Sequence, residues 1–346
     1  ERRPYLWINK LGTDLRCDTV LEWVNEVGKM GLPEERFYVK RIRKALERLR
    51  DLNFDETYTA SRTMATLEYF LTKSFMRYSS GQRFGFINPQ KLFNNMDKVE
   101  KDSAESPYKT LFNISVDGVG RKFFAKGIKS IVNSDVNTFL AAVQPTSKLY
   151  ETLYRALQSA PANTMRRKTL IVNLERSRWR MHEPEGEKYV VVNLPSQQLM
   201  AMEEGAGTLS MNVCVGSPEH QTPMLTSEIT FLELNPYWII PQSIVKRDIV
   251  KHVGDTAYFS GKRFKIVDRT TGSYISPLDI TAEMLLSKKY LVRQDKGEDN
   301  SLGRMIFRFP NPFSIYLHDT NERDVFSQNW RTVSHGCIRL EKPFDL

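Results

Sequence analysis

The sequence reads Tyr316-Leu317-His318-Asp319-Thr320 and, after a spacer, Ser334-His335-Gly336-Cys337-Ile338-Arg339, and these two segments are its most informative feature. A cysteine thiolate attacks a carbonyl carbon well, and a nearby imidazole can take the thiol proton at neutral pH. Gly336 has no Cβ, so backbone N–H groups beside it can approach the oxygen of a reacting carbonyl. The two segments therefore indicate acyl transfer through Cys337.

This pattern resembles the L,D-transpeptidase (YkuD-type) family of cell-wall enzymes. The family signature is a histidine, a spacer and then Ser/Thr-His-Gly-Cys, a hydrophobic residue and Arg or Asn. Here sixteen residues separate His318 from His335, which suits that spacing. Three further segments, 215–223, 235–241 and 300–304, look like the large Gram-negative branch of the family. The resemblance implies an α+β fold, in which a helical scaffold domain and a capping insertion accompany a mainly β catalytic domain.

The residue pattern changes near residue 165 and predicts two domains, a helical scaffold over residues 1–165 and a catalytic domain over residues 166–346. In the first, Val20, Leu21 and Val24 recur at helical spacing. We expect helices over residues 18–30, from 33 onward, and over 57–76, 130–144 and 148–157. In the second, β-branched and aromatic runs broken by Gly, Pro and Asn are typical of strands. We expect strands over residues 168–174, 189–195, 199–202, 209–215, 229–234, 304–310 and 314–317.

Residues 243–300 interrupt the strand pattern. They hold a helical stretch over 243–253 and then polar, glycine-bearing sequence that is typical of loops. One interpretation is a pair of connecting elements. The resemblance implies instead a lid that caps the substrate-binding cleft, and a long irregular insertion in a compact domain usually has a function.

The two ends of the sequence raise separate expectations. The chain stops nine residues after Cys337, whereas catalytic domains of the family usually continue with further helix and strand, so we expect the C-terminal part of the domain to be missing. The charged start Glu1-Arg2-Arg3-Pro4 indicates a trimmed chain, and no signal peptide is visible there. No apolar run approaches the ~18–20 residues that span a bilayer. The resemblance implies export to the periplasm or cell envelope.

The net charge of +9 is uneven: residues 1–165 carry 26 Lys and Arg against 19 Asp and Glu, whereas residues 166–346 carry 24 against 22. Such an excess can attract an anionic polymer such as cell wall, a membrane surface or nucleic acid. The simpler interpretation is a solvated basic helix face, because Ile42, Ala45 and Leu46 interleave with cations between residues 36 and 50. Nucleic acid is not expected as a partner, since no recognised binding module accompanies the charge.

The cysteines do not form a disulfide framework, because there are only three, Cys17, Cys214 and Cys337. Cys214 lies in the apolar run 211–215 and is predicted to be a buried thiol in a strand. His318, His335 and Cys337 are residue types that bind zinc, but the chain has no HExxH and no CxxC. Dinucleotide and P-loop patterns are absent as well. We therefore expect neither a metal nor another cofactor.

Cys337 is the candidate nucleophile and His318 the candidate general base. His335 is a competing base, because in an extended segment its side chain would share one face with that of Cys337. Relatives in the family sometimes lack a histidine at this position, so the resemblance implies that His318 is the base and that His335 shapes the pocket. A third group should fix the tautomer of His318. Asp319 invites this role by its charge, whereas the family more often uses a backbone carbonyl.

The remaining candidates surround the sulfur. The backbone N–H groups of Gly336 and Cys337 are expected to hold the oxyanion. Arg339 can either bind a substrate carboxylate in a bidentate pair or form a structural salt bridge. Ser334 lies where it can touch substrate, but we expect it to support the loop rather than to attack. The resemblance offers three aromatic candidates for the walls of the cleft, which are Tyr316, Trp238 and Trp330.

The resemblance implies acyl transfer between peptidoglycan stem peptides. Cys337 attacks a carbonyl of a donor tetrapeptide after its diamino acid, the terminal D-amino acid leaves, and an amine of an acceptor stem attacks the thioester to form a 3→3 crosslink. Carbapenem inhibitors are expected to acylate the same sulfur. Two alternatives stay open: attack by water would give an L,D-carboxypeptidase, and an inert site would leave a wall-associated scaffold. The sequence does not identify protein partners.

Overall fold

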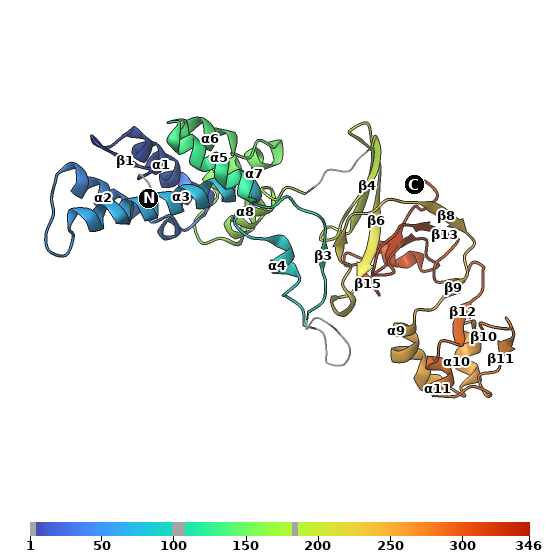
Figure 1. Cartoon of the computed structure of the whole chain (residues 1–346). Coiled ribbons are helices and arrows are strands. Elements are labelled where there is room, and N and C mark those ends of the chain that lie inside the picture. The colour runs from blue at the N-terminus through green and yellow to red at the C-terminus, as the bar shows by residue number, and fades with distance from the viewer. Residues whose placement is uncertain (1–4, 99–107, 182–185) are drawn as a thin grey trace. The chain divides into compact units, whose positions relative to one another are not determined.

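The computed structural model describes residues 5–98, 108–181 and 186–346 of the chain. Two compact units make up the chain, one of residues 1–109 and 114–183 and one of residues 110–113 and 184–346 (Figure 1). The first is helical and the second mainly β, so the predicted α+β class is confirmed. Among the described helices, none is both long enough and apolar enough to cross a membrane.

Helices of the first unit begin where the sequence supplies caps. Asp14, Thr59 and Ser147 each accept a hydrogen bond from a backbone N–H in the first turn of the helix that follows. The long helix α3 buries one face of evenly spaced apolar residues, including Leu67 and Leu71. The helices are α1 (Leu15–Asn25), η1 (Glu26–Met30), η2 (Glu34–Phe37), α2 (Val39–Arg50), α3 (Ala60–Phe84), α4 (Pro89–Phe93), α5 (Arg121–Val132), α6 (Val136–Ala142), α7 (Lys148–Ser159) and α8 (Met165–Arg176).

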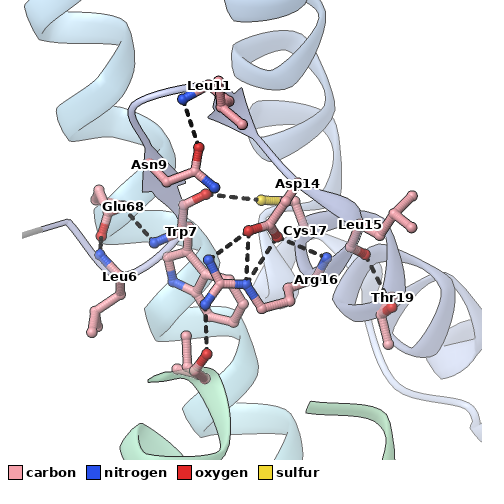
Figure 2. A network of polar contacts seen from close by, with 11 residues as sticks. Leu6, Trp7, Asn9, Leu11, Asp14, Leu15, Arg16, Cys17, Thr19 and Glu68 are labelled. Atoms are coloured by element: carbon pink, nitrogen blue, oxygen red, sulfur yellow. Dashed lines mark hydrogen bonds and ion pairs between the residues drawn. The ribbon is translucent and has the colours of Figure 1, made fainter. Parts of the chain in front are cut away.

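The segment before α1 is tied to α3 by hydrogen bonds (Figure 2). It forms a hairpin of β1 (Ile8–Asn9) and β2 (Gly12–Thr13). Glu68 accepts hydrogen bonds from the backbone N–H groups of Leu6 and Trp7, at 2.9 and 2.8 Å. The Cys17 thiol lies 3.6 Å from the Trp7 carbonyl oxygen, and burial raises the pKa of this thiol to about 12. Cys17 is therefore a packed, protonated thiol in the helical core.

The predicted strand over residues 168–174 is wrong. These residues lie in helix α8, whose first turn is capped by Thr164. Leu170, Ile171 and Leu174 pack in a small core with α7, at the i, i+1, i+4 spacing of a helix face. The β-branched residues in this run resemble a strand locally, but packing of one helical face outweighs that preference. Helix α8 therefore belongs to the first compact unit.

The second unit is built on an eight-stranded sheet with the order β4-β5-β6-β16-β14-β13-β8, and β15 pairs with β6 beside that path. Most neighbours are antiparallel, but β14 and β16 are parallel. The strands that carry the sheet are β4 (Lys188–Asn193), β5 (Gln198–Glu203), β6 (Ala206–Gly216), β8 (Phe231–Leu234), β13 (Met305–Arg308), β14 (Leu317–His318), β15 (Thr332–Ser334) and β16 (Ile338–Leu340). The predicted strands between residues 189 and 310 are thereby confirmed within a few residues. A short parallel pair, β3 (Phe112–Asn113) with β7 (Met224–Leu225), joins residues 110–113 to this unit.

The insertion, defined as residues 238–294, has a core of its own. Its sheet has the order β11-β10-β12-β9, and Val245, Phe259 and Val292 are among its fully buried residues. The predicted helical stretch is confirmed over 242–252, but the predicted loop after it is wrong, because apolar residues there form strands and helices around this core. The elements are β9 (Trp238–Ile239), α9 (Gln242–Ile244), the π-helix η4 (Val245–Ile249), η5 (Val250–His252), α10 (Thr256–Gly261), β10 (Phe264–Asp268), β11 (Tyr274–Ile275), α11 (Ala282–Leu286) and β12 (Tyr290–Gln294).

Candidate active site

The parallel pair β14 and β16 brings the two signature segments together. Leu317 lies opposite Ile338, and His318 lies opposite Arg339. The Ile338 backbone N–H donates to the Tyr316 carbonyl at 3.0 Å, which places Cys337, the residue just before β16, beside Tyr316. Leu317 and Ile338 face the core of the sheet. Because side chains alternate between the faces of a sheet, this register predicts that His318 and Cys337, the residue just before β16, lie on the opposite face.

His318 is buried and has one ring nitrogen engaged. Its Nδ1 lies 2.5 Å from the backbone carbonyl oxygen of Asp319. A carbonyl can only accept a hydrogen bond, so Nδ1 carries the proton and Nε2 has a free lone pair. Burial lowers the pKa of His318 to about 4, while the hydrogen bond to Asp319 opposes that shift. At neutral pH the ring is therefore uncharged and able to accept a proton.

The Asp319 side chain has a separate structural task. Its Oδ2 accepts the Arg304 backbone N–H at 2.8 Å, and its Oδ1 pairs with the Arg323 guanidinium. Gly303 sits directly against this carboxylate: a Cβ at Gly303 would lie 2.4 Å from Asp319 Cγ, and its φ is +61°. Of the two groups weighed for orienting His318, the backbone carbonyl makes the contact. The carboxylate instead anchors the loop 300–304.

The Cys337 thiol is protonated at rest. Burial raises its pKa, against the effects of a hydrogen bond from the Tyr316 backbone N–H and of the Arg339 and Arg308 charges. Its Sγ lies 3.9 Å from the Ser314 carbonyl oxygen, and the side chain is partly exposed. A thiol in this state reacts slowly until a base removes its proton. The neighbouring uncharged His318 is the group suited to that task.

The loop before the sulfur is held by two hydroxyl groups. Ser334 Oγ donates to the Cys337 carbonyl at 2.5 Å and accepts the Gly336 N–H at 3.1 Å. Thr222 Oγ1 donates to the Gly336 carbonyl at 2.8 Å. Gly336 has a φ of +112°, which an L side chain rarely adopts. Ser334 and Thr222 thus fix a backbone turn that requires glycine.

This loop geometry changes the expected set of oxyanion donors. The Gly336 N–H is occupied by Ser334 Oγ, so Gly336 does not offer it to a ligand. The Cys337 N–H meets no acceptor among the residues that the structure describes. The expectation of two donors from this loop is therefore corrected to one, and the glycine contributes its backbone conformation.

His335 does not share a face with Cys337, because the turn at Gly336 removes the extended geometry assumed for this segment. Its exposed ring stacks on that of His220, with centroids 4.9 Å apart. Its Nε2 lies 3.9 Å from Asp248 Oδ2, on the insertion. Burial lowers the pKa of His335, and the charge of Arg247 lowers it further. His335 therefore faces the insertion rather than the sulfur.

The remaining candidates divide between the site and its supports. Arg339 Nη1 forms a salt bridge with Glu322 Oε2 at 2.5 Å. Two roles were considered for Arg339, binding of a substrate carboxylate and a structural salt bridge, and this contact corresponds to the second. Trp238 is partly buried and packs against the core of the insertion with Phe264, at 6.1 Å between ring centroids. Tyr316 is partly buried beneath the Arg308 guanidinium, and Trp330 is 75% exposed.

Sequence reasoning did not single out four residues that contact this site: Thr222, His220, Arg247 and Asp248. The first two lie in the segment 215–223, which carried the family resemblance, so that segment was the available signal. The other two lie in an unremarkable helical stretch of the insertion, where nothing in the sequence marks them. Within the described residues, no cluster of three or more His, Cys, Asp and Glu side chains could hold a metal ion.

A first prediction concerns stability and pH. The folded-state pKa of His318 lies below the value of 6.5 for an unperturbed histidine, so its neutral form stabilises the fold above pH 6.5 and this contribution is lost as pH falls toward about 4. The depressed pKa corresponds to about 3 kcal/mol. The free energy of unfolding of the wild type should therefore fall more between pH 6.5 and 4 than that of His318→Gln. Urea unfolding of both proteins across this range measures the difference, and parallel pH curves would contradict it.

Two family models match most of the chain. Residues 187–346 match the L,D-transpeptidase catalytic domain, YkuD, and residues 2–157 match the Scaffold domain. A Haemophilus influenzae protein with the name "Putative L,D-transpeptidase" is 29% identical over 220 residues, which cover 62% of this chain and 44% of that protein. The chain thus spans less than half the length of this relative.

The solved structures that are similar to this chain include L,D-transpeptidases. The alignment with one from Mycobacterium smegmatis has 17% sequence identity and a TM-score of 0.26, and it covers 48% of this chain and 54% of the other chain. The alignment with one from Enterococcus faecium has 12% sequence identity and a TM-score of 0.25, and it covers 78% of this chain and 73% of the other chain. Residues 187–346 belong to the YkuD family of L,D-transpeptidase catalytic domains, and residues 2–157 belong to the Scaffold domain family.

Proposed function

We propose that this chain is a peptidoglycan L,D-transpeptidase that works through a thioester on Cys337. The observation that carries the proposal is the uncharged, buried His318, whose Nδ1–H is held by the Asp319 carbonyl and whose strand neighbours that of Cys337. This arrangement leaves Nε2 free to take the thiol proton. Family membership supports an acyltransferase, and the residue roles are our assignment.

The first half-reaction forms the acyl-enzyme. His318 Nε2 takes the proton of Cys337, and the thiolate attacks the carbonyl carbon after the diamino acid of a donor tetrapeptide. The Cys337 N–H stabilises the oxyanion, and one such donor is worth about 3 kcal/mol in a transition state. The C–N bond then breaks, His318 returns its proton to the leaving amine, and the terminal D-amino acid departs. The donor is left as a thioester.

The second half-reaction transfers the acyl group. The amine of an acceptor stem attacks the thioester, the C–S bond breaks, and a 3→3 crosslink forms. Ser334 and Thr222 hold the loop in place, and Arg339 supports it through Glu322. Tyr316 and Trp330 remain candidates for contacts with the stem peptides. Carbapenems should acylate the same sulfur, since they too present a carbonyl carbon to the thiolate.

Product analysis distinguishes transfer from its alternatives. The protein is incubated with purified tetrapeptide-bearing wall fragments, and the products are read by mass. We expect crosslinked dimers that have lost one terminal D-amino acid. Trimmed monomers alone would instead indicate an L,D-carboxypeptidase. No product, together with a carbapenem that adds no mass to the wild type, would indicate a wall-associated scaffold with an inert site.

We also propose a cellular location for this reaction. A peptidoglycan substrate places the protein in the cell envelope, in the periplasm of a Gram-negative cell. The matched region covers 44% of the Haemophilus influenzae relative. The activity and the partners that we propose are therefore our inference for this chain.

A further inference from the structure

A charged cluster of the insertion lies against the loop that carries the sulfur. We define the cluster as Arg247 and Asp248 on η4, together with His220 and His335 of the catalytic sheet. Arg247 donates to the Asp248 carboxylate through Nε at 3.0 Å and through Nη2 at 2.7 Å, and its Nη1 contacts His220 Nε2. Asp248 Oδ2 lies 3.9 Å from His335 Nε2. The insertion thus reaches a residue only two positions from Cys337.

Arg247 and Asp248 both lie in a π-helix, Val245–Ile249, and such elements occur frequently at functional sites. The guanidinium and the carboxylate pair with each other at 2.7 Å, and Asp248 lies near His335 of the loop 334–337.

The cluster remains open to a ligand. The Arg247, Asp248 and His335 side chains are 40%, 37% and 49% exposed. An ion pair at this exposure contributes only about 0–1 kcal/mol to stability, so an incoming group can replace it at little cost. Such a pair also does little to hold the insertion in place. A purely structural role therefore explains the pair poorly.

We propose that this cluster is the subsite for the acceptor stem, in which Asp248 binds the acceptor ammonium and Arg247 binds a carboxylate on the same carbon. The inference rests on the proposed function and names the acceptor as a zwitterionic α-amino-acid group. The chemistry fits, because an aspartate accepts from an ammonium and an arginine pairs with a carboxylate in a bidentate manner. The donor acyl group occupies Cys337, so the acceptor approaches from the side of His335.

The acceptor ammonium loses one proton to His335 Nε2, which passes it to solvent through its exposed side. The resulting amine nitrogen attacks the thioester carbon, the C–N bond forms and the C–S bond breaks. The second amine proton reaches the departing sulfur through His318, which regenerates the Cys337 thiol. No oxidant, reductant or further reactant is needed.

The groups that face Asp248 set the charge of the subsite. Arg247, His335 and Lys251 all lower the pKa of its carboxyl, and the hydrogen bond from Arg247 has the largest effect. Asp248 is therefore ionised at neutral pH, as binding of an ammonium requires. A stem whose acceptor amine has no neighbouring carboxylate would use Asp248 alone and should be a poorer acceptor.

Two variants and a matched control test the subsite. Asp248→Asn and Arg247→Gln remove one charge each, and Lys246→Gln removes an exposed charge from the same helix outside the cluster. The probes are an acceptor tetrapeptide with a free carboxylate beside its amine and the same peptide with that carboxylate amidated. Crosslinking at varied acceptor concentration is compared with carbapenem acylation of each protein, measured by mass.

For Asp248→Asn we expect the KM for the acceptor to rise about tenfold or more, with a much smaller change in the rate of acylation. Arg247→Gln should abolish the preference of the wild type for the free carboxylate over the amide, whereas Lys246→Gln should keep it. Wild-type acceptor kinetics in both variants would overturn the inference, and so would equal losses of acylation and transfer. If the wild type itself fails to acylate, the proposed function is wrong and the subsite falls with it.

Discussion

Cys337→Ala is expected to reduce turnover of tetrapeptide substrates on the order of 10⁵-fold or more, the largest effect of any single change in this chain. The reason is that, in the proposed mechanism, the sulfur carries the acyl group, and alanine offers no atom to bind it. Only the slow uncatalysed reaction and any assistance from the Cys337 N–H would remain. Mass analysis of crosslinked products at several enzyme concentrations measures the loss.

Cys214→Ala is the matched control for this variant. Cys214 is buried in β6 opposite Arg339, and burial raises the pKa of its thiol to about 11. It therefore contributes almost no thiolate at neutral pH, and its loss should leave turnover within a few-fold of the wild type. An active Cys337→Ala protein, or an inactive but folded Cys214→Ala protein, would contradict the assignment of the nucleophile.

His318→Gln has the second largest expected effect, a fall in turnover of about 10²- to 10⁴-fold. Glutamine can still donate a hydrogen bond toward the Asp319 carbonyl, but it cannot accept the thiol proton. The pH profile of the wild type should also report this residue. Because the pKa of His318 lies at about 4, turnover should fall as pH drops through about 4 rather than through 6.5.

His335→Gln separates the two histidines. Since His335 faces Asp248 rather than the sulfur, its replacement should leave acylation by a carbapenem close to wild type and mainly weaken transfer to the acceptor. If His335→Gln abolished acylation while His318→Gln did not, the roles assigned to the two histidines would be reversed. Circular dichroism of both variants checks that each is folded.

The sequence was sufficient for the fold class, because helical periodicity and strand alternation are local features. The register of β14 and β16 brings the segments of His318 and Cys337 together, whereas the catalytic roles of these two residues stay a prediction. The β-branched run at 168–174 has the local pattern of a strand, and so it was predicted to be one. It forms a helix because Thr164 caps the first turn and Leu174 is buried in the helical core. Tertiary packing decides such cases, and a single sequence does not display it.

The sequence predicted that Ser334 supports the loop, but its hydrogen bond with the Gly336 N–H depends on a turn that the sequence does not specify. The sequence left two roles open for Arg339, and it did not indicate the pairing with Glu322. The same holds for Arg247 and Asp248, which meet the catalytic loop only through the fold of the insertion.

The measurement that tests the central claim most directly is the mass of the intact protein after exposure to a carbapenem, followed by peptide mapping. The account predicts one added inhibitor mass on the wild type, located on the peptide that contains Cys337, and none on Cys337→Ala. A modification located on Cys17 or Cys214, or an unmodified wild type with Cys337 still reduced, would contradict it.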